Sequence, residues 1–327
     1  MPYLFHQNMR VFGGGTGARN AAYQATFAAE VAAGGYLAAV PPVWIAGFTE
    51  VTNNLTAANV FSGGGGLGFN LCAALGVNHV ANVACGQTLL ANGPEYIALG
   101  VHPACAVLAV GRIFLNADWG IRLHQDISLG AAPPIGWQNH VPAAATRDYR
   151  GLVYMIVNVP NGAGGMHPIA VGFLHNLYTL EAQRILVMQN LPQMLALMGN
   201  GAPAAPVAYY IGGDFNVGVV SPRGTARLGY AHAYSIDKFN YPPIPPIPAG
   251  APFGYGPCSP NGTLWGGNLY DYWFSNIYPG PPPPPVNAPP APLLGAPVPM
   301  TINSTLNAPT GVAGTMSDHC GTALQIV

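Results

Sequence analysis

The sequence predicts a layered α/β domain, and three observations lead to this prediction. Half of the 327 residues are apolar, so the chain can bury a sizeable hydrophobic core. Glycine (43 residues) and proline (34 residues) are abundant, which is typical of many loops and short strands rather than long helices. Short alternating runs are interspersed with two segments of helical character, an order of elements that favours sheets covered by helices.

Alternation of apolar and polar residues marks the expected strands. These are Tyr3–Arg10, Val43–Glu50, Ala106–Leu115, Leu152–Val159, Ile169–His175 and Val207–Phe215, followed by two strand-like pieces at Leu269–Asn276 and Met316–Val327. The apolar segment from Tyr96 to Leu115 is interrupted by His102, Pro103 and Arg112. This interruption makes the segment a poor membrane-spanning helix and favours a pair of buried strands.

Two segments are expected to be helical. Ala18–Tyr36 is rich in alanine, with Tyr23, Phe27 and Val31 near helical spacing. Glu181–Met198 has a single apolar face, which is made of Ile185, Met188, Leu191, Leu195 and Met198. We find no repeat of 20–50 residues, which argues against a solenoid or a propeller.

A proline-rich zone covers residues 240 to 310, where runs such as PPIPPIP and GPPPPPV occur. Such runs favour extended, polyproline-like loop. The strand-like pieces Leu269–Asn276 and Met316–Val327 are separated by this proline-rich sequence. We therefore interpret the zone as a loop insertion within one domain that spans residues 1–327.

Charged residues make up only 6% of the chain, where roughly 25% is usual. The net charge of -1 provides no overall field that would attract nucleic acid or an acidic membrane.

The N-terminus has no basic stretch followed by an apolar run, so we expect no secretory signal, and the compartment stays open between cytoplasm and a signal-independent export route. The five cysteines have no metal-type spacing, which favours buried free thiols.

The most specific motif is Gly213-Asp214-Phe215-Asn216, which follows the apolar run VAYYIG. Two residues apart on a strand, the carboxylate of Asp214 and the carboxamide of Asn216 lie on the same side. One can hold a hard cation or a water molecule while the other orients a phosphate oxygen. A structural Asx turn at the end of a strand is the alternative.

Four other strings carry candidate polar residues. Glu50 closes the apolar strand VWIAGF, His175 ends the strand IAVGFLH, Asp271 lies inside an aromatic strand, and Asp318-His319 lies near the C-terminus. An isolated glutamate after an apolar run is costly unless it is solvated, paired or bound to metal. A lone histidine at a strand end can equally be structural. The glycine-rich segments lack the Lys-Ser/Thr of a phosphate loop, and the other histidines, His6 included, have no zinc-type spacing.

The order of these strings, from Asn8 in the first strand to His319, resembles the DNase I-like (endonuclease/exonuclease/phosphatase) superfamily. Its strand ends carry an acid, a histidine, GDFN, a further acid and a terminal SDH. The Leu-His form of the histidine motif is similar to DNase I and to the catalytic subunit of cytolethal distending toxins. The resemblance implies a four-layer α/β sandwich of two packed mixed β-sheets flanked by helices, with these strand ends on one edge.

The resemblance also implies a role for each residue. His175 and His319 would be the paired catalytic histidines, with Glu95 and Asp271 as their respective carboxylate partners. Asp214 and Asn216 would position water and phosphate, and Arg150 would hold the scissile phosphate. The implied metal ligands are Glu50, Asn8 and Asp318, and they would bind Mg²⁺, Mn²⁺ or Ca²⁺ through oxygen atoms.

The substrate implied first is DNA, cleaved by a metal-dependent phosphodiesterase. One departure bears on it: the loop after Glu50 reads VTNN, where DNA-cutting relatives tend to carry a basic residue. Besides Arg150 with Arg147, only Arg223 with Arg227 forms a local basic cluster.

Two alternatives remain. The first is a phosphodiesterase or phosphatase for phospholipid, sphingomyelin or phosphoinositide, which the scarce basic charge and the aromatic residues of the proline-rich zone favour. The second is a catalytically inactive binding module, against which the full set of motif residues argues.

Overall fold

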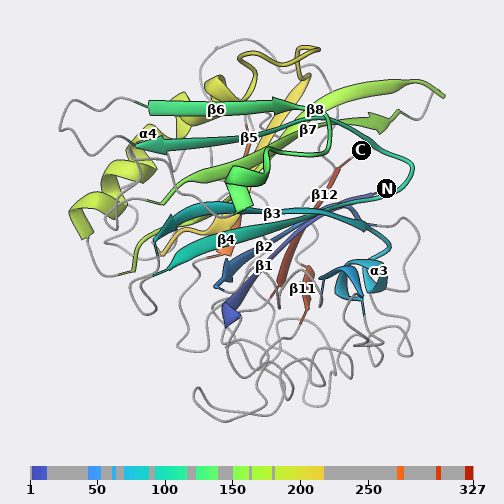
Figure 1. Cartoon of the computed structure of the whole chain (residues 1–327). Coiled ribbons are helices and arrows are strands. Elements are labelled where there is room, and N and C mark those ends of the chain that lie inside the picture. Colours follow the sequence, from blue (N-terminus) through green and yellow to red (C-terminus); the bar gives the residue numbers. More distant parts are fainter. Residues whose placement is uncertain are drawn as a thin grey trace.

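In the computed structural model, the described residues are 2–12, 43–52, 61–63, 70–87, 93–115, 123–138, 150–161, 164–178, 181–216, 271–275, 300–302 and 321–326. Within these ranges, twelve strands form two six-stranded sheets that stack face to face (Figure 1).

The first sheet has the strand order β11-β12-β1-β2-β4-β3. Its strands are β11 (Met300–Ile302), β12 (Gly321–Gln325), β1 (Tyr3–Phe12), β2 (Val43–Val51), β4 (Pro94–Val101) and β3 (Asn78–Gln87). Strands β1 and β2 are parallel, whereas the other neighbours are antiparallel. The first and last parts of the chain therefore lie side by side at the centre of this sheet.

The second sheet has the order β10-β9-β8-β7-β5-β6. Its strands are β10 (Asp271–Ser275), β9 (Ala208–Asp214), β8 (Met166–His175), β7 (Leu152–Pro160), β5 (Ala106–Leu115) and β6 (Leu123–Leu129). Strands β8 and β9 are parallel, and the other pairs are antiparallel. Because β8 and β9 run the same way in register, His175 lies beside Asp214.

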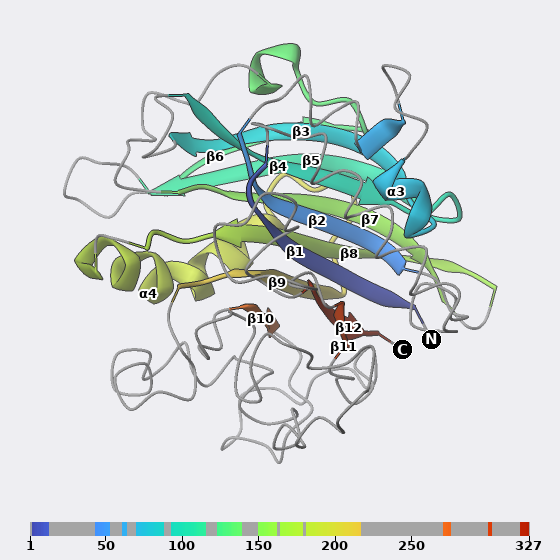
Figure 2. The same ribbon diagram turned by 90° about the horizontal axis from the view of Figure 1, so that it is seen from below.

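Three hydrophobic layers hold the two sheets and their helices together. Figure 2 shows the same strands and helices from below. The middle layer lies between the sheets and contains buried side chains from both, such as Leu4, Phe173 and Trp273. The outer layer of the first sheet includes Leu71 and Cys72 of the short helix α3 (Leu71–Ala74). Helix α4 (Glu181–Met198) covers the outer face of the second sheet with residues such as Met188 and Leu191. The predicted α/β sandwich of two mixed sheets flanked by helices is confirmed.

The two sheets approach closely at Gly47 of β2. A Cβ atom at Gly47 would overlap the ring of Phe173 from β8 in the opposite sheet. The missing side chain thus makes room for a buried aromatic ring, which keeps β2 and β8 close together. This local contact brings the ends of β2 and β8 to the same edge of the sandwich.

Most predicted elements agree with the structure within a few residues. The helix at Glu181–Met198 has the predicted bounds, although Ile185 on its predicted apolar face stays partly exposed. Strands β3 and β6 were not predicted, because polar residues interrupt their apolar pattern. Helix α3 was not predicted either, because its four residues are too few to show a helical period. The predicted helix Ala18–Tyr36 lies outside the described residues.

The structure corrects part of the expectation for the proline-rich zone. Met300–Ile302 forms strand β11 against β12, where the sequence predicted loop, because β12 offers an unpaired edge to which three residues can add. Among the described cysteines, Cys72 and Cys85 are buried free thiols, as predicted, and Cys105 is a half-buried one. No helix in the described ranges is both long and apolar enough to cross a membrane.

Candidate active site

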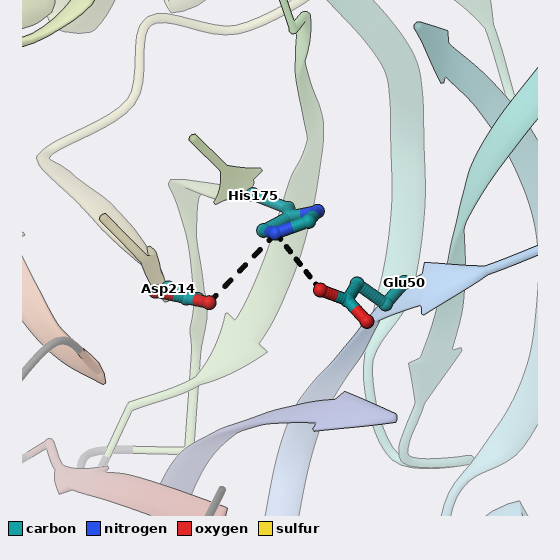
Figure 3. Close-up of side chains that lie close together, drawn as sticks. All are labelled: Glu50, His175 and Asp214. Carbon is teal, nitrogen blue, oxygen red and sulfur yellow. Dashed lines mark ion pairs between the residues drawn. The ribbon is translucent and has the colours of Figure 1, made fainter. Parts of the chain in front are cut away.

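Polar side chains from both sheets meet at one edge of the sandwich (Figure 3). Glu50 lies at the end of β2 in the first sheet, whereas His175 and Asp214 end the parallel strands β8 and β9 in the second sheet. Glu95 lies at the start of β4, which runs antiparallel to β2, so that this residue reaches the same edge. The topology of the two sheets therefore collects side chains that are far apart in the sequence.

Glu50 occupies an unusual backbone conformation, with φ at +56°. Positive φ is uncommon for a residue other than glycine and costs on the order of 1–3 kcal/mol. The pairing of β2 with β4 shifts register between Phe48 and Val51, so Glu50 lies in an irregularity of the strand. This irregularity brings Glu50 Oε1 to 3.1 Å from His175 Nε2, while one fifth of the Glu50 side chain stays exposed.

Two carboxylates lie near the Nε2 atom of His175. Asp214 Oδ2 lies 3.8 Å from this nitrogen, in addition to the Glu50 oxygen. Within the described residues, Glu50, His175 and Asp214 form a group in which one ligand atom of each lies within 4.8 Å of the others. The side chains of His175 and Asp214 are buried, so their charges are little screened by water.

The opposite nitrogen of His175 contacts a third carboxylate. Its Nδ1 lies 2.6 Å from Glu95 Oε1, at hydrogen-bonding distance. The second oxygen of Glu95 lies 2.6 Å from Arg150 Nη1, and all three side chains are buried. The Arg150–Glu95 contact is a short ion pair. Arg150, Glu95 and His175 thus form a buried charged chain.

The carboxylates change the acidity of His175. Burial by itself lowers the pKa of the imidazole, but the negative charges of Glu95 and Glu50 and their hydrogen bonds outweigh burial and hold the pKa well above its ordinary value of 6.5. The protonated form of His175 is therefore favoured at neutral pH when no cation is bound.

Asp214 is held by the side-chain amide of Asn8 on β1 and by the backbone amide of Asn216, two residues further along the chain. Asn8 Nδ2 of β1 donates to Asp214 Oδ2 at 2.9 Å, which links the two sheets. The backbone N–H of Asn216 donates to Asp214 Oδ1 at 2.9 Å, and its side-chain amide donates to the carbonyl of Asn176 at 2.8 Å. Asn216 has φ at +52°, so both Glu50 and Asn216 have positive φ beside the same histidine. Backbone strain of this kind clusters at functional sites.

Gly213 allows the close pairing of β9 with β8. A Cβ atom at this position would overlap the carbonyl oxygen of Leu174 in the neighbouring strand. Backbone atoms cannot move aside as a flexible side chain can. The glycine of the GDFN motif is therefore required for packing, and it fixes Asp214 beside His175.

Comparison with known proteins identifies the fold. The sequence matches no protein-family model, and no curated protein is similar to it in sequence. Among solved structures, an endonuclease/exonuclease/phosphatase family protein from Bacteroides thetaiotaomicron superposes with a TM-score of 0.51 at 14% identity, over 99% of this chain and 96% of that one. The mannosyl-6-phosphatase Bt3783 of the same organism gives a TM-score of 0.50 at 13% identity over the full length of both chains.

The chain has the DNase I-like fold.

Within this DNase I-like fold, the structure brings together most residues that the sequence singled out. Asn8, Glu50, Glu95, Arg150, His175, Asp214 and Asn216 lie in the contacts described above. Asp271 begins β10 directly opposite Asp214 of β9, and both are buried. Asp318 and His319 lie outside the described residues, as do Arg147, Arg223 and Arg227.

Three residues of the site were not predicted from the sequence. Asn176 follows His175 and accepts a hydrogen bond from Asn216 through its carbonyl. His6 and Thr49 are buried on β1 and β2 and contact each other, with 3.1 Å between His6 Nε2 and Thr49 Oγ1. The only signal for His6 was its position two residues before Asn8 on the same strand, which puts both side chains on the same face.

The donor set fits a hard divalent cation. Glu50 and Asp214 offer carboxylate oxygens within one small group, and Asn8 adds an amide side chain in contact with Asp214. Oxygen atoms of this type are the ligands that Mg²⁺ and Ca²⁺ prefer. Glu50, Glu95 and Asp214 give three negative charges against Arg150 and a protonated His175, so the group keeps an excess of negative charge that a cation would neutralise.

Proposed function

We propose that this chain is a divalent-metal-dependent phosphodiester hydrolase in which His175 transfers a proton at its Nε2 atom. The observation that carries the proposal is the geometry of His175, whose Nδ1 lies 2.6 Å from Glu95 while Nε2 faces Glu50 and Asp214. The DNase I-like fold supports it, because one of the similar structures is described as a mannosyl-6-phosphatase and another as an endonuclease/exonuclease/phosphatase family protein.

Glu95 has the role of an orienting carboxylate in this proposal. By accepting a hydrogen bond from Nδ1–H, it fixes the tautomer of His175 and leaves Nε2 as the nitrogen that faces the reacting group. Arg150 holds the other oxygen of Glu95 and so prevents the carboxylate from turning away. General acid–base catalysis by a positioned histidine contributes typically 10²–10⁴-fold.

Glu50, with Asn8 and Asp318, would hold the divalent ion, and oxygen donors of this kind suit Mg²⁺, Mn²⁺ or Ca²⁺. When bound, the ion polarises the phosphate and neutralises its charge. Asp214 and Asn216 orient the attacking water and a phosphate oxygen. His319, whose proposed partner is Asp271, would complete the proton transfers as the second histidine.

Arg150 has donor capacity beyond Glu95. Its Nε is buried and has no hydrogen-bond partner among the residues that the structure describes, which is costly unless an anion is bound during function. We therefore assign the phosphate to Arg150 and expect Arg150→Ala to reduce turnover more than binding, because the charge on the phosphate group grows in the transition state.

DNA is the first substrate that we propose, because the residues His175, Asp214 and Asn216 follow the pattern of the nucleases in this fold. A phospholipid is the second candidate. It is favoured by the charge content of 6%, which leaves few basic side chains to neutralise a nucleic acid backbone.

The test compares plasmid DNA, sphingomyelin vesicles and phosphoinositide vesicles, each incubated with the protein in Mg²⁺, in Mn²⁺ and in excess chelator. Hydrolysis that requires metal and falls roughly 10²-fold or more in His175→Asn supports the proposal. His124→Asn is the matched control, because His124 also contacts a carboxylate, Asp126, but on β6 at the far edge of the second sheet. Hydrolysis that survives both the chelator and His175→Asn would contradict the proposed mechanism.

A further inference from the structure

His6 is a second buried histidine beside the site, and the proposed mechanism does not use it. It lies on β1 with no exposed surface, and its ring stacks on Phe173 of the opposite sheet with centroids 6.4 Å apart. Its Nε2 lies 3.1 Å from Thr49 Oγ1 on the neighbouring strand β2. A polar ring is thus buried between the sheets at a position where an apolar side chain would also fit.

The other nitrogen of His6 faces a carboxylate of the site. Its Nδ1 lies 3.8 Å from Asp271 Oδ1, at ion-pair distance, and both side chains have no exposed surface. Asp271 starts β10 of the second sheet, so this contact joins the two sheets. A carboxylate interacts more strongly with a polar neighbour in such a buried place, because little water screens the interaction.

The His6–Asp271 contact has a counterpart two residues further along β1, on the neighbouring strand β9. His6 and Asn8 are two residues apart on β1 and face the same side, whereas Asp271 and Asp214 lie directly opposite each other on β10 and β9. Asn8 donates to Asp214, and His6 faces Asp271. Strand β1 therefore presents one polar side chain to each of the two buried aspartates.

One tautomer of neutral His6 suits both neighbours. With the proton on Nδ1, the ring presents an N–H to the Asp271 carboxylate while Nε2 accepts the Thr49 hydroxyl proton. The Asp271 carboxylate can only accept and so favours this tautomer, the Thr49 hydroxyl is compatible with it, and the stack on Phe173 fixes the plane of the ring. Because His6 is fully buried, we do not expect it to contact a substrate directly.

We propose that His6 is a positioning residue that orients the buried Asp271 carboxylate of the site. This role rests on the proposed function, because it concerns the same hydrolysis. It predicts that turnover depends on His6 although the residue does not touch the substrate. It also predicts that His6 acts only when Asp271 is present.

The test measures kcat and KM for hydrolysis of bis(4-nitrophenyl) phosphate in Mg²⁺ by the full chain. His6→Phe keeps the ring and its stack on Phe173 but removes both nitrogens. We expect kcat to fall roughly 10- to 100-fold, as is typical when a supporting residue behind a site is lost, with KM unchanged. His6→Asn keeps an N–H near the Nδ1 position and should recover most of kcat, whereas His6→Gln, whose amide reaches toward Thr49, should not.

A double variant separates positioning from a structural role. If His6 acts through Asp271, adding His6→Phe to Asp271→Asn should lower kcat no further. The matched control is His79→Phe, because His79 stacks on Phe61 and contacts Asn82 in the same manner, but on β3 at the opposite edge of the first sheet. It should leave kcat unchanged.

Three results would overturn this role: multiplicative losses in the double variant, His6→Gln more active than His6→Asn, or wild-type kcat in a folded His6→Phe. The comparison of His6→Asn with His6→Gln decides the question even if His6→Phe does not fold. Wild-type protein that hydrolyses neither this substrate nor DNA or lipid would overturn the proposed function together with the role of His6. Wild-type hydrolysis without dependence on His6 would overturn the positioning role alone.

Discussion

The substitution Glu95→Gln tests the buried charged chain at the centre of the site. Glu95 lies 2.6 Å from both Arg150 Nη1 and His175 Nδ1, and the exposed fractions of these three residues are 2%, 5% and 6%. Removing one member of a buried ion pair leaves an uncompensated charge and costs about 3–5 kcal/mol. Glutamine retains an oxygen that can accept the hydrogen bond from His175 Nδ1, so we expect a loss at the lower end of this range, about 3 kcal/mol in the free energy of unfolding.

This loss is measured by urea unfolding, followed by circular dichroism, in the presence of chelator. Since a domain is typically stable by about 5–15 kcal/mol, a change of this size moves the unfolding midpoint clearly. The double variant Glu95→Gln/Arg150→Met removes both charges and should cost less than the sum of the single changes, with a coupling of roughly 1–3 kcal/mol.

The control for this experiment is a partly exposed contact of the same kind. His124 lies 3.0 Å from Asp126 with 46% of its side chain exposed, so His124→Gln should change stability by less than about 1 kcal/mol. A change of less than about 0.5 kcal/mol for Glu95→Gln, or strict additivity with Arg150→Met, would refute the reasoning, because surface substitutions already produce effects of that size.

Three further predictions concern metal binding, pH and packing. Glu50→Gln should abolish Mg²⁺-dependent hydrolysis and weaken Mn²⁺ binding in calorimetry while the circular dichroism spectrum stays unchanged; full activity in this variant would exclude Glu50 as a ligand. Because the pKa of His175 is raised in the folded metal-free protein, its pairing stabilises fully below pH 6.5 and is lost as the pH rises through the raised pKa. Unfolding at a series of pH values in chelator should therefore show wild type losing stability above pH 6.5 relative to His175→Asn, and parallel curves would contradict this. Gly213→Ala should destabilise by about 1–3 kcal/mol because its Cβ meets the Leu174 carbonyl, whereas Gly136→Ala, with open space around it, should have little effect on thermal unfolding.

The sequence alone determined the layered fold and the identity of most polar residues at the site. Strict alternation in segments such as Ile169–His175 predicts strands because side chains on a strand alternate between two faces. Strands β3 and β6 escaped prediction, since residues such as Asn78, Asn82 and Gln125 break their apolar pattern. Local patterns report on one strand at a time, and edge strands carry the weakest pattern.

The pairing of these residues was decided by the tertiary structure. Glu95 and His175 are 80 residues apart in the sequence, and Asn8 and Asp214 are 206 apart, so no local pattern reports on their contact. The resemblance to the DNase I-like superfamily implied the Glu95–His175 pair. Nothing in the sequence indicated that Arg150 would contact the second oxygen of Glu95.

His6 shows the same limit most clearly. His6 belongs to no motif with a characteristic spacing. Its proposed role depends on contacts with Thr49 of β2 and Asp271 of β10. The strand period of two predicts that His6 and Asn8 face the same side of β1. Which side chain lies across from it depends on how the two sheets stack, and that is set by contacts between distant residues such as Gly47 and Phe173.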